Sequence, residues 1–170
     1  MKKFLAFAIQ IIIAHTVTYF IVGAIAYQFL TKPLYEGSAP IFASFMRTPA
    51  DPDLWRQVMI WFIPAQVLRG LLMAVALYPF YSTLLAWSIR KRFLSLAGLY
   101  LIFGYWASAV AAPGTIDGLV YMRPEFTAST HLIVQPEIIL QGGALAWWVA
   151  RWMGRKEAKL VLSHAGKPSA

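Results

Sequence analysis

The sequence contains no cysteine, and only 13% of its 170 residues are charged. The absence of cysteine excludes a disulfide scaffold, thiol catalysis, iron–sulfur clusters and cysteine-ligated zinc. A soluble domain has about 25% charged and about 45–50% apolar residues, whereas 59% of this chain is hydrophobic. This balance excludes a soluble globular or a disordered protein and favours a membrane protein.

Motifs of common enzyme classes are also lacking. The chain has no GxSxG, Walker A, GxGxxG or HExxH pattern. We therefore assign no catalytic residue, no metal site and no cofactor, and we expect binding rather than catalysis. The formal net charge of +8 does not indicate a nucleic-acid partner, because the basic residues lie in short clusters between apolar runs, as membrane topology requires.

Four apolar runs are each about as long as the roughly 20 residues that a spanning helix needs. The sequence therefore predicts an all-α integral membrane protein, one domain over residues 1–170 with four transmembrane helices in a bundle. The expected spans are about 4–30, 58–87, 93–112 and 130–152, followed by a basic tail at 153–170. The first run exceeds the 7–15 apolar residues typical of a signal peptide, so we expect a retained anchor.

Basic residues occur at alternate ends of these runs. Lys2 and Lys3 precede the first, the sequence Arg90-Lys91-Arg92 separates the second from the third, and the tail that follows the fourth is basic. The positive-inside rule then places both termini in the cytoplasm. The local patterns PxxxLRG, QPE and PGTIDG suggest a small bacterial protein, so we expect the bacterial inner membrane.

The segment between the first two spans is expected to be extracytoplasmic and partly helical. Asp51-Pro52-Asp53 combines an N-cap residue, a proline at the first helical position and an acid in the first turn, which predicts a helix start near Pro52. A straight helix from there to the end of the second span would exceed the membrane thickness. We therefore expect kinks near Pro64 and Pro79.

Arg69 and Glu137 are charged residues inside apolar runs. A charge at the centre of a bilayer costs at least about 2.5–3.5 kcal/mol on insertion scales and often marks a functional site. Both residues are expected in the outer half of the membrane, where they could meet. Three interpretations stay open: a polar site that binds a ligand, an interhelical salt bridge without a ligand, and an arginine that extends to the interface.

Polar neighbours accompany both charges on the second and fourth predicted helices. The candidate binding residues are Arg69, Glu137, Gln66, Gln135, Gln141 and His131. The glutamines could instead only join one helix to another. His15, in the first helix, is expected to be a neutral, hydrogen-bonded interhelical histidine.

The sequence supports three functions. The first is a module that binds or helps move a polar or anionic small molecule or lipid headgroup in a site between the second and fourth helices. The second is an accessory or structural subunit of a membrane complex. The third is a membrane enzyme that modifies a lipid or isoprenoid, with Glu137 or His131 as acid or base. Membrane lipids are the expected partners, with a possible homo-oligomer or membrane-protein partner.

Overall fold

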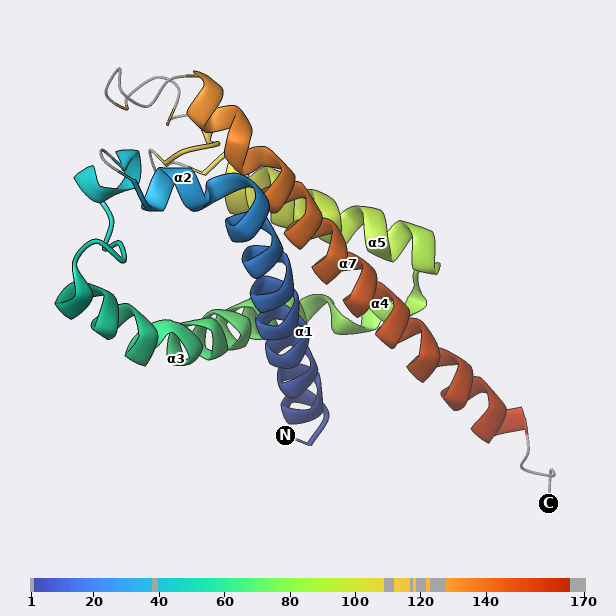
Figure 1. The fold of residues 1–170 in the computed structure, drawn as a ribbon. Helices are drawn as coiled ribbons and strands as arrows, with labels where there is room; N and C mark the ends of the chain where they lie inside the picture. Colours follow the sequence, from blue (N-terminus) through green and yellow to red (C-terminus); the bar gives the residue numbers. More distant parts are fainter. Residues whose placement is uncertain are drawn as a thin grey trace.

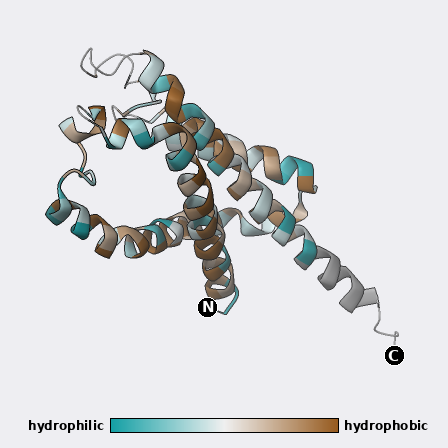
Figure 2. Cartoon of the chain, viewed as in Figure 1, coloured by the Kyte–Doolittle hydropathy of each residue, from teal (hydrophilic) through white to brown (hydrophobic). Residues whose placement is uncertain are grey.

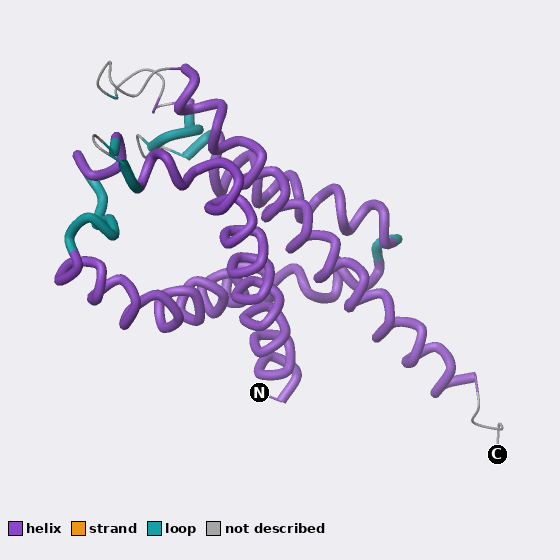
Figure 3. The backbone as a smooth tube through the Cα atoms, in the orientation of Figure 1, coloured by secondary structure: helices purple, strands orange, loops and turns teal. Residues whose placement is uncertain are grey.

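The structure is a computed structural model that describes residues 2–37, 40–108, 112–116, 118, 122 and 128–165, with only the backbone for 156–165. The described residues form helices and connecting loops without a strand (Figure 3). The main helices are α1 (Lys2–Ala26), α2 (Lys32–Tyr35), α3 (Pro52–Leu77), α4 (Tyr81–Ala86), α5 (Ile89–Gly98) and α7 (Ala128–Ala165). Shorter helical turns are η1 (Tyr27–Thr31), η2 (Ile41–Ser44), η3 (Tyr78–Phe80) and η4 (Leu99–Trp106).

Within the described residues, three helical stretches are long and apolar enough to cross a membrane: Lys2–Tyr35, Pro52–Ala86 and Ala128–Arg155. Figure 2 shows the apolar character of α1 and of much of α3. These stretches confirm an all-helical fold and indicate a membrane protein.

The predicted third span differs from the other three. The described helix there comprises α5 and η4 and ends at Trp106, and it begins among three basic residues. Its apolar part is shorter than the roughly 20 residues needed to cross the bilayer. Residues 109–111 of this predicted span lie outside the described residues. A fourth span and the location of the termini therefore stay predictions.

The helix start predicted at Pro52 is confirmed. The Asp51 side chain accepts a hydrogen bond of 3.1 Å from the Leu54 backbone N–H, and Pro52 occupies the first helical turn. α3 continues as one helix through Pro64. Pro79 lies in the 3-10 turn η3, which separates α3 from α4.

α1 lies at the centre of the helical arrangement. It packs against α3 on one side and against α7 on the other, and α5 packs along α7 (Figure 1). Among the described residues, α3 and α7 make at most marginal contact with each other. A site shared by these two helices, the second and fourth of the sequence analysis, must therefore include α1 as a third wall.

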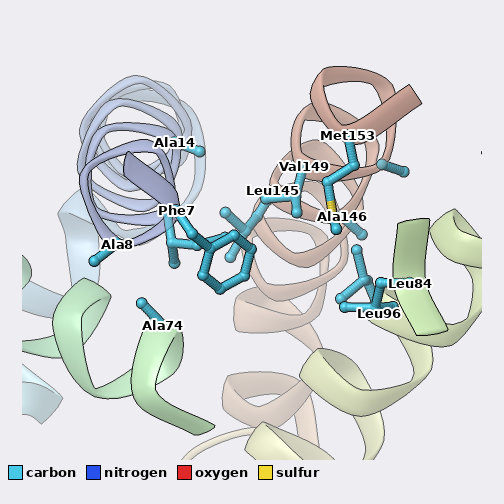
Figure 4. Packing of buried hydrophobic residues seen from close by; sticks show 12 residues of the cluster. Phe7, Ala8, Ala14, Ala74, Leu84, Leu96, Leu145, Ala146, Val149 and Met153 are labelled. Carbon is cyan, nitrogen blue, oxygen red and sulfur yellow. The ribbon is translucent and has the colours of Figure 1, made fainter. Parts of the chain in front are cut away.

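The larger buried cluster joins α1, α3, α5 and α7. Phe7 is fully buried, and its ring lies near those of Tyr81 and Trp152 at centroid distances of 5.2 and 6.1 Å. Figure 4 shows Phe7 close to α7, with Leu84 and Leu96 on the other side of that helix. This packing fixes the position of α1 against α7.

Gly70 allows α1 and α3 to approach closely. A Cβ atom at this position would lie 2.8 Å from the Ile12 Cα atom, which is backbone and cannot rotate away. We expect Gly70→Ala to lower the free energy of unfolding by about 1–3 kcal/mol, because overpacking forces the helices apart. Thermal unfolding in detergent, followed by circular dichroism, measures the effect.

Gly143→Ala is the matched control, because nothing lies within 4 Å of a Cβ atom at Gly143. Alanine favours a helix over glycine by about 1 kcal/mol, so this variant should be as stable as the wild type or slightly more so. Equal stability of the two variants would contradict the close α1–α3 contact.

Candidate functional site

Arg69 and Glu137 line one cavity of about 300 Å³. Arg69 comes from α3 and Glu137 from α7, and α1 contributes Tyr19 to the wall between them. The wall is completed by side chains of Thr31, Tyr35, Phe42, Tyr100, Tyr105 and Gln141, among others. A cavity of this size is at the lower limit of small-molecule sites, which occupy about 300–1,000 Å³.

The two charges do not neutralise each other. Among the described residues, the one ion pair joins Lys32 and Glu36 at 3.9 Å, at the exposed end of α2. Neither Arg69 nor Glu137 makes a hydrogen bond with another described residue. The carboxylate of Glu137 lies against Gly23 of α1, where a Cβ atom would be 3.7 Å from Oε1. The cavity therefore has an arginine and a glutamate in its walls, and neither is paired with another described residue.

Further polar groups face this cavity. Gln141 is buried, and its Nε2 atom has no hydrogen-bond partner among the described residues. A buried amide donor without a partner costs about 1–3 kcal/mol, so an acceptor atom in the cavity would relieve it. Tyr19 and Tyr105 also line this cavity and bring their hydroxyl-bearing side chains to its wall.

A wider cavity of about 700 Å³ adjoins the first at Glu137 and Tyr19. It lies between α1 and the first half of α3, and the segment between them supplies Arg47 and Pro49 to its wall. The polar cavity thus has an approach from the side on which the connecting segment lies.

Gln66 is not in the polar cavity. Its Oε1 atom lies 3.0 Å from His15 Nε2, and both side chains are buried at the contact between α3 and α1. The pair is the hydrogen-bonded interhelical histidine that the sequence predicts. It secures the two helices that form one side of the cavity.

His131 and Gln135 hold the loop that follows η4. His131 Nδ1 accepts a 2.9 Å hydrogen bond from the Gly114 N–H, and Gln135 Nε2 donates to the Gly114 carbonyl at 3.0 Å. Trp106 Nε1 donates to Gln135 Oε1 at 2.9 Å. Gly114 has a φ of 92°, which glycine adopts without strain.

Of the six candidate residues, the structure therefore brings Arg69, Glu137 and Gln141 together, and it places the other three in helix and loop contacts.

The hydrogen bonds of Gln135 to this loop are expected to stabilise the fold. Gln135→Leu removes the hydrogen bonds to Gly114 and Trp106 and leaves their polar groups without this partner. We expect the free energy of unfolding to fall by about 1–3 kcal/mol, with little change in ligand binding. Parallel measurements of thermal stability and of ligand retention check both parts. Unchanged stability together with lost binding would instead make Gln135 a ligand contact.

Arg92 is a buried residue that the sequence analysis treated only as part of a topology signal. It is 0% exposed. Its guanidinium donates to the carbonyls of Leu84, Leu85 and Trp87 at 2.6, 3.0 and 2.7 Å, and to that of Ala150 at 2.7 Å. It thereby satisfies carbonyls at the end of α4 and ties them to α7. A basic residue just after a helix C-terminus was the available signal.

Comparison with known protein families, with curated proteins and with solved structures finds no match to this chain.

Proposed function

We propose that this protein binds a polar or anionic small molecule or lipid headgroup in the cavity lined by Arg69, Glu137 and Gln141, and holds it or helps it move within the membrane. The observation that carries the proposal is that Arg69 and Glu137 line the same cavity without pairing with each other. A charge within an apolar span is costly, and an anion beside Arg69 would reduce that cost.

The chemistry of the walls supports this assignment. A guanidinium offers several N–H donors in a planar fork that fits a phosphate or carboxylate group. The free amide of Gln141 supplies another donor. Glu137 can accept from a hydroxyl or ammonium group of the same ligand. The wider cavity beyond Glu137 supplies a path by which such a ligand could enter.

We place the protein in the bacterial inner membrane as a four-helix bundle with both termini in the cytoplasm. The alternation of basic ends along the sequence supports this orientation. In this orientation, the connecting segment and the wider cavity face the extracytoplasmic side. Four helices are few for a complete transport path, so movement of a ligand across the membrane would require an oligomer.

Native mass spectrometry of protein extracted gently from its own membrane tests the proposal. We expect the wild type to carry a bound molecule of defined mass and Arg69→Gln to lose it. Arg56→Gln is the matched control, because it removes the same charge from an exposed position of the same helix outside the cavity. The proposal fails if the wild type carries no adduct, or if all three proteins carry it equally.

A further inference from the structure

A third cavity, of about 450 Å³, also adjoins the polar one. It lies between α3, α5 with η4, and α7, and its walls are almost entirely apolar. They include Met73, Ala76, Leu77, Leu96, Leu99 and Leu145. Of the six candidate binding residues, Arg69 alone lines this cavity.

Arg69 and Tyr100 line both cavities. Arg69 therefore lies at the boundary between a polar cavity, which Glu137 and Gln141 also line, and an apolar cavity. A small water-soluble anion would occupy only the polar cavity. A molecule with a charged head and a hydrocarbon chain would occupy both, with its anionic group beside Arg69.

The apolar cavity is also accessible from the lipid. Phe80 and Leu99 are 58% and 47% exposed, and Ala76 is exposed as well. These residues belong to an apolar helical region, so their exposed faces are expected to contact lipid chains. A hydrocarbon chain could pass from the bilayer into this cavity without crossing water.

We infer that the ligand is an amphiphile whose phosphate-bearing headgroup occupies the polar cavity and whose hydrocarbon chain occupies the apolar one. This inference rests on the proposed function. A phosphate group matches the donors of Arg69 and Gln141, and a hydroxyl or ammonium group on the same head matches Glu137. An ionised fatty acid fits less well, because its one polar group is a carboxylate, which has no hydrogen-bond donor for Glu137.

Isothermal titration in a non-ionic detergent tests the inference with two probes that share one headgroup. Myristoyl lysophosphatidylethanolamine carries the chain, and glycerophosphoethanolamine is the headgroup without it. We expect the chain-bearing probe to bind at least about tenfold more tightly, because its chain alone can fill the apolar cavity. A tenfold ratio corresponds to about 1.4 kcal/mol. Inorganic phosphate is the third probe and should bind no better than the free headgroup.

Two substitutions on α3 locate the chain. Ala76→Phe places a ring in the apolar cavity at an exposed position and should weaken binding of the myristoyl probe at least about tenfold. Val75→Phe is the control, because Val75 is 52% exposed and lines neither cavity. It should bind the probe as the wild type does.

The outcomes separate the inference from the proposed function. If the free headgroup or inorganic phosphate binds as tightly as the myristoyl probe, and Arg69→Gln abolishes that binding, the amphiphile is wrong and the anion site stands. Equal effects of Ala76→Phe and Val75→Phe would also overturn the placement of the chain. If no probe binds in an Arg69-dependent way, the proposed function fails as well.

Discussion

Arg92→Met is expected to destabilise the protein more than any other single substitution considered. The guanidinium donates at least four hydrogen bonds to backbone carbonyls of α4, the following turn and α7. Methionine fills similar space but donates none of them. Two buried and two half-buried carbonyls would lose this donor, at about 1–3 kcal/mol for each buried group left unsatisfied. We expect the free energy of unfolding to fall by about 3 kcal/mol or more.

Arg90→Met is the control for charge and for topology. Arg90 is exposed and belongs to the same basic cluster, so both variants lose one positive charge at the same end of the helix. Thermal unfolding in detergent should show a large decrease in midpoint for Arg92→Met and little change for Arg90→Met. Similar midpoints would mean that Arg92 serves only as a topology signal.

Arg69→Gln is expected to weaken binding of myristoyl lysophosphatidylethanolamine by about 100-fold or more. A hydrogen bond to a charged group contributes about 1.5–3 kcal/mol, and a guanidinium can make two such bonds to one phosphate. Their loss corresponds to at least about two powers of ten in Kd. Isothermal titration of both proteins in the same detergent measures the ratio.

Arg69→Lys separates the effect of charge from that of geometry. Lysine keeps the positive charge but lacks the planar fork, so its Kd should lie between those of the wild type and Arg69→Gln. Stability should change little in either variant, because Arg69 has no partner among the described residues. A Kd for Arg69→Gln within about threefold of the wild-type value, less than 1 kcal/mol, would place the anion elsewhere.

Local signals in the sequence predicted the long helices and drew attention to two charged residues that line one cavity. The apolar runs predicted four spanning helices, and three described helical stretches are long and apolar enough to cross a membrane. The pattern Asp51-Pro52-Asp53 predicted the start of α3. The cost of a charge in lipid drew attention to Arg69 and Glu137, and both residues line one cavity. These signals depend on neighbouring residues or on composition, so they can be recognised without knowing how the helices pack.

Features set by packing could not be predicted in the same way. The position of α1 between α3 and α7 could not be predicted, because the residues of α1 are apolar on all faces of the helix. Without that arrangement, Gln66 and Gln135 could not be distinguished from Gln141. Gln66 pairs with His15, Gln135 binds a loop, and only Gln141 faces the cavity.

Arg92 shows the same limit for a charged residue. Its place among Arg90 and Lys91 is typical of a topology signal, and both neighbours are exposed. Of the three basic residues, Arg92 alone is buried. The break between α4 and α5 leaves helix-end carbonyls that need donors, and Arg92 supplies them. Composition does not reveal which of three adjacent basic residues points inward.

We propose that Arg69 and Glu137 line a shared cavity as separate contacts for a ligand and do not form a salt bridge. A double-mutant cycle tests it most directly. The free energy of unfolding would be measured, on protein stripped of lipid, for the wild type, Arg69→Gln, Glu137→Gln and the double variant. We expect the two effects to add within about 0.5 kcal/mol, as for residues that do not interact. A coupling energy of about 1 kcal/mol or more would show that the two charges stabilise each other and would contradict the proposed site.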